Sequence, residues 1–159
     1  MSVTTSPDGI IYSPDILTVA NVVDADVTVT NSATLVDVPD LTIPIGKRER
    51  ILFRYTLFYT TTASGDLKYR VEIPASPTLY RLAIKSIDPG GTHAQSVITA
   101  EADGTVTATS GTDGLLELRG VLVNAGTEGE VKFQFAQNTA TSAESAIIRR
   151  GSFLEFRRF

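Results

Sequence analysis

The sequence predicts an all-β fold, an antiparallel β-sandwich of the jelly-roll kind with an extended N-terminal arm. Three observations support this prediction. Apolar and polar residues alternate with a period of two over most of the chain from Ala25 onward. Turn-forming Gly, Pro, Asn and Asp interrupt the alternation about every 8–15 residues, as in sandwiches and jelly rolls. No window shows a sustained apolar period of 3.6 residues, so no long helix is expected.

The composition bounds the size and the class of the protein. The chain has 159 residues, a net charge of −4 and no cysteine. This length suits one domain. The lack of cysteine excludes disulfides and thiolate metal sites. The N-terminus has neither the basic nor the apolar region of a secretory signal, and no run approaches the roughly 20 apolar residues of a membrane span. We therefore expect synthesis in a cytoplasm and no membrane partner.

Residues 1–24 are expected to form the arm and residues 25–159 the sandwich domain. Pro7 and Pro14 each lie beside turn-forming residues, and little periodicity surrounds them. Between the prolines lies an apolar patch, Ile10-Ile11-Tyr12. A disordered tail seldom carries such a patch, because low hydrophobicity is the mark of disorder. We expect the patch to contact a partner, and the alternative is that the arm folds back on its own domain.

The first half of the domain is predicted to hold five strands: Val27–Thr30, Leu41–Ile45, Glu49–Thr62, Leu67–Ile73 and Tyr80–Lys85. Pro44 cannot donate a hydrogen bond to a ladder, so the second strand is an edge strand or ends there. The third strand is the longest, and the face expected to point into the core comprises Ile51, Phe53, Tyr55, Leu57 and Tyr59. The third and fourth strands, separated by a turn at Ala63–Asp66, are expected to form a hairpin. A strong turn follows the fifth strand at Asp88-Pro89-Gly90-Gly91.

The second half is predicted to hold six strands: Val97–Ala100, Thr105–Thr109, Leu116–Leu122, Val131–Phe135, Ile147–Arg150 and Phe153–Phe159. An Asp-Gly turn at Asp103-Gly104 separates the first two of them. The third and fourth, joined by a turn-rich segment at Asn124–Gly129, are expected to form a second hairpin. Gln137–Ala146 is polar and is expected to be a loop or a short helix.

No set of residues assembles into a catalytic, metal or cofactor site. His93 is the only histidine and lacks the further ligands of a transition-metal site. No Gly-x-Ser-x-Gly motif is present. Carboxylates gather at Asp24/Asp26 and at Asp37/Asp40, where a glycosidase pair is one interpretation and turn stabilisation is the other. We favour turn stabilisation and expect no catalytic residue, no metal and no cofactor.

Basic residues gather at Lys47–Arg50, at Arg149–Arg150 and at Arg157–Arg158. Nucleic-acid affinity depends on Lys and Arg that release counterions, and the chain as a whole is acidic. We therefore expect no nucleic-acid partner. Arginine is enriched at protein interfaces, so these clusters are interpreted as a solvated strand face or the rim of an interface.

The end of the chain leaves apolar surface for a neighbour. Phe153 and Phe159 share one face of the last predicted strand, whereas Phe156 lies on the other face, so the three rings cannot all be buried together. Exposed apolar surface of this kind marks association. The predicted partner interface comprises Ile10, Ile11, Tyr12, Phe153, Phe156 and Phe159.

Five runs of the chain together resemble a known domain. They are Ala33–Ile45, Arg50–Thr61, Leu118–Thr127, Val131–Gln137 and Arg150–Leu154. In that order they resemble a β-sandwich domain of tailed-bacteriophage virion proteins, found in capsid decoration (cement) proteins and in tail or head-fibre modules. The resemblance covers roughly residues 28–159 and leaves the arm outside. It implies a homotrimeric, non-enzymatic component of the virion.

The leading hypothesis is a capsid decoration protein on the exterior of the capsid, made in the host cytoplasm, whose arm binds the major capsid protein or a sister protomer. A tail fibre would add shaft repeats, and the sequence has none. The second hypothesis is a tail-fibre, tail-tip or head-fibre module that binds a host receptor or glycan through surface aromatics such as Tyr59 or Tyr80. The third is a carboxylate-based glycosidase.

Overall fold

The protein is all-β, which confirms the predicted class. A computed structural model describes residues 4–5, 11–12, 18–62 and 65–159, with side chains described from residue 21 onward. These residues contain strands and no helix, and thus no helix that could cross a membrane. The strands are β1 (Thr4–Thr5), β2 (Ile11–Tyr12), β3 (Thr18–Val22), β4 (Val27–Thr30), β5 (Val36–Ile45), β6 (Arg50–Thr61), β7 (Leu67–Glu72), β8 (Leu79–Ile87), β9 (His93–Ile98), β10 (Gly104–Val106), β11 (Gly114–Val123), β12 (Gly129–Gln137), β13 (Ser145–Ile148) and β14 (Phe153–Arg158).

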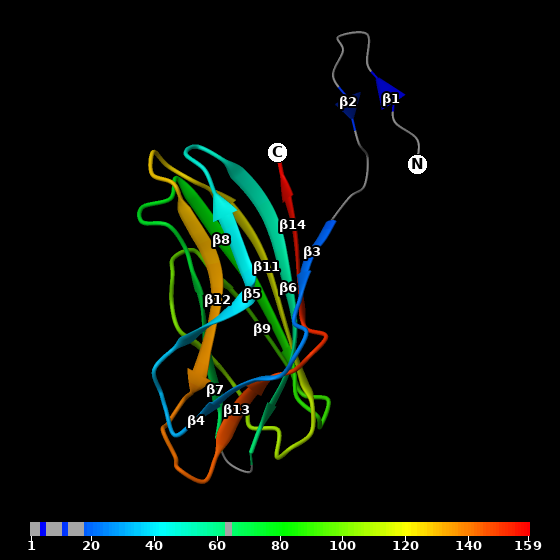
Figure 1. The fold of residues 1–159 in the computed structure, drawn as a ribbon, viewed down its shortest axis with the longest axis vertical. Coiled ribbons are helices and arrows are strands. Elements are labelled where there is room, and N and C mark those ends of the chain that lie inside the picture. The colour runs from blue at the N-terminus through cyan, green and yellow to red at the C-terminus, as the bar shows by residue number, and fades with distance from the viewer. Residues whose placement is uncertain (1–3, 6–10, 13–17, 63–64) are drawn as a thin grey trace.

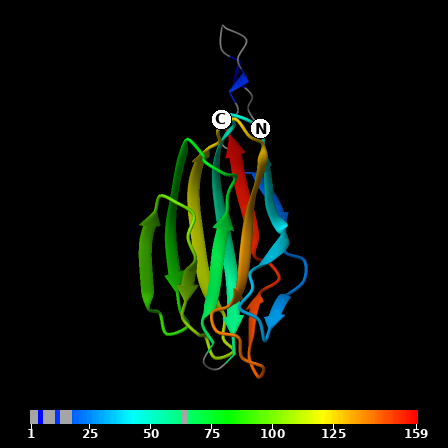
Figure 2. The same cartoon turned by 90° about the vertical axis from the view of Figure 1, so that its left-hand side faces the viewer.

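Two antiparallel sheets pack face to face (Figures 1 and 2). The smaller sheet has the order β10-β7-β12-β5. The larger sheet has the order β3-β14-β6-β11-β8-β9, and β13 joins it by pairing with β6 and β4. β5 is an edge strand, so the position predicted from Pro44 is confirmed.

The strands β5 to β12 are paired in a nested order. β8 pairs with β9, β7 with β10, β6 with β11, and β5 with β12. This is the order of a long hairpin rolled into two sheets, which is the jelly roll. The tip of the hairpin is the predicted turn, where the Gly91 N–H donates to the Asp88 carbonyl at 2.9 Å and the Asp88 N–H donates to the Thr92 carbonyl at 3.1 Å.

Both hairpins predicted between consecutive strands are wrong. β6 and β7 lie in different sheets, and so do β11 and β12. Each turn therefore carries the chain across the sandwich instead of back along the same sheet. The reason is that turn-forming residues mark where the chain reverses, whereas the sheet that the next strand joins depends on distant partners. The segment after β12 is a loop up to β13, without a helix.

The predicted core face of β6 is buried, as expected. Tyr55 and Tyr59 are fully buried, and the Tyr55 ring centroid lies 5.9 Å from that of Phe133 on the opposite sheet. The Tyr69 ring stacks on Phe133 from the same sheet at 6.4 Å. Such aromatic pairs stabilise beyond their buried area. Burial raises the pKa of Tyr69 to about 12, which keeps its hydroxyl neutral inside the sandwich.

Three aromatic rings in the core lie over a glycine on the neighbouring strand. Phe53 is the cross-strand partner of Gly120, Tyr59 of Gly114, and Tyr69 of Gly104. A Cβ atom at Gly120 would lie 2.1 Å from Cζ of Phe53, far inside van der Waals contact. These glycines are therefore required by the close approach of a ring.

The larger sheet begins within the span predicted to be arm. β3 pairs with β14, and Thr18 lies opposite Phe156. Val23 is fully buried, its N–H donates to the Ser152 carbonyl at 2.8 Å, and its carbonyl accepts from the Gly151 N–H at 2.9 Å. Residues 18–23 are thus part of the sandwich. β1 and β2 pair with each other as a separate two-stranded sheet.

Candidate functional site

The candidate site is the outer surface of the larger sheet, where outward side chains of neighbouring strands form two rows. The register places Arg157, Leu52, Val121 and Arg81 side by side in one row. It places Glu155, Arg54, Arg119, Ala83 and Val97 side by side in the next. These nine residues, with Lys85 and Glu117, are called the basic face below.

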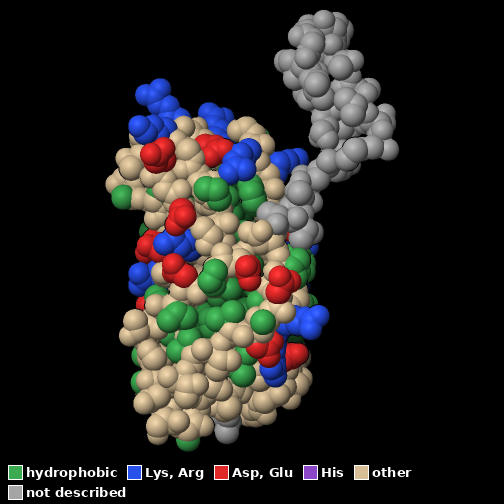
Figure 3. Space-filling model, viewed as in Figure 1, with side chains coloured by type: hydrophobic (Ala, Val, Ile, Leu, Met, Phe, Trp, Pro, Cys, Tyr) green, Lys and Arg blue, Asp and Glu red, His purple; other side chains and the backbone are tan. Residues whose placement is uncertain are grey.

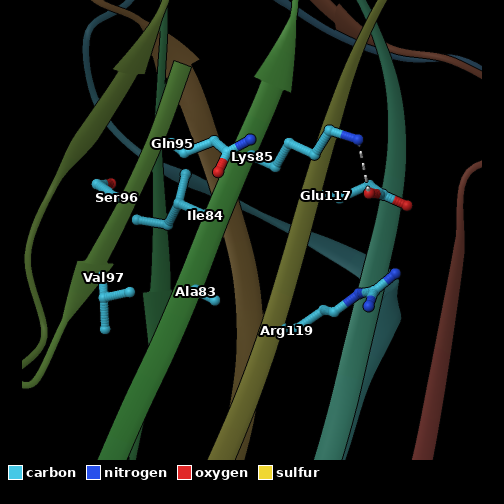
Figure 4. A pocket seen from close by; sticks show the side chains of 8 residues that line it. All are labelled: Ala83, Ile84, Lys85, Gln95, Ser96, Val97, Glu117 and Arg119. Atoms are coloured by element: carbon cyan, nitrogen blue, oxygen red, sulfur yellow. Dashed lines mark ion pairs between the residues drawn. The ribbon is translucent and has the colours of Figure 1, made fainter. Parts of the chain in front are cut away.

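A groove of about 400 Å³ runs over the basic face. Its floor is apolar, with Leu52, Val121 and Ala83 in the middle and Val97, which is 66% exposed, towards the edge. A second hollow of about 480 Å³ adjoins it over β8, β9 and β11 (Figure 4). Figure 4 shows Arg119, Lys85 and Glu117 rising from neighbouring strands beside this hollow. The face therefore combines apolar contact area with basic groups.

The charges of the basic face are only partly neutralised. Nε of Arg54 lies 2.8 Å from Oε2 of Glu155, and Nζ of Lys85 lies 4.0 Å from Oε2 of Glu117. Within the described part of the chain, no ion pair or hydrogen bond reaches the side chains of Arg81, Arg119 and Arg157, which are all exposed. The face holds five cations and two carboxylates, an excess of three positive charges on an acidic protein.

The position of Arg119 is electrostatically unfavourable in this chain alone. Arg119 lies directly opposite Arg54 on β6. Like charges that face each other across strands destabilise a sheet. The carboxylate of Glu155 offsets one of the two, because Arg54 pairs with it. An acidic group from another molecule would offset the second.

The outer surface of the smaller sheet is different, because Lys132 and Arg70 on it are ion-paired. Nζ of Lys132 lies 3.4 Å from Asp37 and Glu130 and 3.7 Å from Glu72, whose charges raise the pKa of the lysine, Asp37 most of all. Nε of Arg70 donates to Asp103 at 2.6 Å. In Figure 3, acidic and basic side chains are mixed on the side that carries β5 and β12. This surface is therefore internally compensated and acidic overall.

Sequence reasoning missed the basic face as a site. Alternation along single strands does predict that Arg54 and Arg119 point away from the core. It cannot predict that they are neighbours, because their strands are far apart in sequence. One feature of the sequence could have indicated the site. The outward positions of β6 and β11 are apolar and basic, whereas a strand face that only contacts water has no need of apolar residues.

The predicted interface residues are distributed over three places. Phe153 lies half-buried on the outer surface of the larger sheet, beside the exposed Val22 of β3. Phe156 points inward, packs against the core, and has the Arg158 guanidinium 4.9 Å from its ring centroid. Phe159 is 60% exposed at the end of the sheet.

The apolar patch of the arm is described only in part. Ile10 lies outside the described residues, whereas Ile11 and Tyr12 form β2, whose side chains also lie outside them. The assignment of Ile10, Ile11, Tyr12 and the three phenylalanines to a partner interface stays a prediction.

Arg149, which directly follows β13, is bound by the carboxylates of Asp26 and Asp113. Asp26 accepts from Nη1 of Arg149 at 2.8 Å and from the Arg150 N–H at 2.7 Å. Asp113 accepts from the Thr60 hydroxyl at 2.6 Å and from Nε of Arg149 at 3.0 Å. These hydrogen bonds lower the pKa of both carboxyls. A glycosidase acid needs a raised pKa, so the lowered pKa values of Asp26 and Asp113 fit a structural role for these two carboxylates.

The carboxylate pair predicts a specific dependence of stability on pH. Since the folded pKa values of Asp26 and Asp113 lie below the ordinary value of 3.8, their stabilisation is present above that value and is lost as the pH falls through the folded values. We expect the free energy of unfolding to fall between about pH 5 and pH 2, and to fall less steeply in D26N/D113N. Urea unfolding at each pH measures this. Equal slopes for the two proteins would contradict it.

The described residues contain no cluster of three or more His, Asp or Glu side chains that could hold a metal ion. His93 lies at the exposed start of β9. A single exposed histidine does not form a metal site.

Comparisons with known proteins give few matches. No protein-family description matches the chain, and no curated protein sequence matches it. The chain is similar to a structure of infectious bursal disease virus, Gx strain, at 12% identity and a TM-score of 0.26, covering 99% of this chain and 45% of that one. It is also similar to a mutant VP2 protein of the same virus in derived T=1 particles, at 11% identity and a TM-score of 0.19, covering 99% and 43%. The chain thus spans less than half the length of each.

Proposed function

We propose that this chain is a non-enzymatic structural protein of a phage virion, a capsid decoration protein that sits on the outside of the shell and stabilises it by binding the major capsid protein. A homotrimer is the proposed form. One observation carries the proposal: β1 and β2 pair with each other and join neither main sheet. A two-stranded hairpin is marginal in water on its own, so this arm needs a partner.

Other features support the same function. The strands β5 to β12 form a jelly roll, an architecture common in virus shells. The resemblance to phage virion domains covers these strands. The ion-paired outer surface of the smaller sheet suits exposure to solvent, whereas the basic face and the arm offer two surfaces for association.

The glycan-binding alternative receives less support. That hypothesis requires exposed aromatic rings, and the two named for it, Tyr59 and Tyr80, are 0% and 3% exposed. Stacking on a sugar needs an accessible ring face, which neither residue offers. A glycan array with the purified protein tests this alternative directly, and specific binding to a host glycan would replace the decoration proposal.

Deletion of residues 1–17 is expected to abolish binding to capsids while leaving the sandwich folded. The deletion stops before Thr18 because β3 and the buried Val23 belong to the larger sheet. Purified capsids that lack this protein would be mixed with each variant and sedimented. We expect the unfolding midpoint to stay within a few degrees of the full chain.

A narrower variant is I10S/I11S/Y12S in the full chain. It removes only the apolar patch and should lose capsid binding as well. Normal occupancy of the capsid by the protein without residues 1–17 would contradict the proposal. Binding by the triple variant but not by the deletion would assign the contact to the rest of the arm.

A further inference from the structure

The basic face has unpaired arginines around an apolar centre, and no described residue covers it. Arg81 and Arg157 flank the apolar pair of Leu52 and Val121 in one row, about 14 Å apart across three strand spacings. Arg119 faces Arg54 in the next row without an acid of its own. A ligand that fits this surface is apolar in the middle and carries carboxylates towards its ends.

The N-terminal arm of this chain has that composition. Ile10-Ile11-Tyr12 is flanked by Asp8 on one side and Asp15 on the other. The chain has no Lys or Arg before Lys47. Arginine binds carboxylates through two parallel hydrogen bonds, which are stronger than hydrogen bonds between neutral groups. The arm is thus complementary to the basic face in both charge and polarity.

We propose that the basic face is the docking surface for the N-terminal arm of a second copy of this chain. The arm is attached at the end of the larger sheet, where Thr18 lies opposite Phe156. Tyr12 lies six residues before Thr18, so the patch reaches up to roughly 20 Å from the sheet, which is enough to contact a neighbouring sandwich that lies against this end of it. Exchange of arms around a closed ring gives each protomer one occupied basic face.

The recognition has separate apolar and ionic parts. The Ile-Ile-Tyr patch packs on Leu52, Val121 and Val97, which removes apolar surface of both molecules from water. Asp8 and Asp15 pair with the exposed arginines and relieve the repulsion between Arg54 and Arg119. The inference rests on the arm used in the proposed function: the patch binds a sister copy, and its loss removes capsid binding because the ring of copies that sits on the capsid no longer forms.

The test is charge reversal followed by restoration. Mass would be measured by light scattering and sedimentation over a micromolar concentration range in about 0.1 M salt, where exposed charges are not fully screened. We expect the full chain to associate. R81E/R119E and D8K/D15K should each lower the association constant at least tenfold. Combining the four substitutions should restore association, because the signs are exchanged. The matched control K47E/R48E reverses two exposed charges outside the basic face and should associate as the unaltered chain does.

Two results would overturn the inference. One is a full chain that remains monomeric throughout the range; if R81E/R119E then also loses capsid binding, the face belongs to the capsid protein. The other is association of R81E/R119E equal to that of the unaltered chain. Thermal unfolding of each variant shows that the fold is kept. Because no capsid is present in the mass measurements, failure here leaves the decoration proposal intact, and failure of capsid sedimentation leaves this inference intact.

Discussion

Replacing Asn124 with alanine is expected to lower the free energy of unfolding by about 3 kcal/mol, because it removes three hydrogen bonds of a buried side chain, each worth about 1 kcal/mol. Asn124 is 2% exposed. Its Nδ2 donates to the carbonyl of Gly46 at 2.8 Å and to that of Thr127 at 2.7 Å, and its Oδ1 accepts from the Ala125 N–H at 3.0 Å. One side chain thus ties the β5–β6 turn to the β11–β12 connection.

Chemical denaturation of N124A measures this loss as a shift of the midpoint at constant slope. The matched control is N138A, since Asn138 is exposed and its side chain has no hydrogen bond within the described residues. We expect that variant to change stability by less than about 0.5 kcal/mol. An N124A protein as stable as N138A would show that water replaces the amide at no cost.

Replacing Gly120 with alanine is expected to cost about 2 kcal/mol. Overpacking a dense core costs about 1–3 kcal/mol, and the new methyl would lie 2.1 Å from Cζ of a Phe53 ring that is only 3% exposed. Alanine in a strand recovers about 0.5–1 kcal/mol of backbone entropy, which is too little to reverse the sign. The clash therefore dominates, because the ring is packed in the core.

The control for Gly120 is Gly126, where an added Cβ meets nothing within 4 Å. G126A should be neutral or slightly stabilising in the same denaturation experiment. The double variant F53L/G120A supplies a further check, since a smaller side chain at Phe53 makes room for the methyl. If G120A is as stable as G126A, the sheet relaxes at this point and the ring does not constrain it.

Much of the fold could be predicted from the sequence, because strand position is a local property. Alternation placed Ile51 through Tyr59 in the core, and Pro44 placed β5 at an edge. Pairing is not local, and so both predicted hairpins were wrong. The turn before β7 and the turn before β12 show a reversal of the chain, whereas the choice of sheet depends on partners such as β10 and β5.

The candidate site was predictable only in part for the same reason. The sequence placed Phe153 and Phe156 on opposite faces of one strand, and the structure agrees. The basic face needs three strand pairings to bring Arg157, Leu52 and Arg81 into one row. No spacing along the chain encodes that row. Arginines on different strands become one surface only through the register.

The nested pairing of the strands also determines when each strand can find its partner during synthesis. β8 and β9 can pair as soon as both have left the ribosome, since only a short turn separates them. β6 must wait for β11, β13 and β14, and β5 must wait for β12. Long-range pairing of this type is slow, on the order of milliseconds to seconds. Until the last strands arrive, the nascent chain exposes unpaired strand edges that invite aggregation. Folding of this domain is therefore completed only once β14 has emerged.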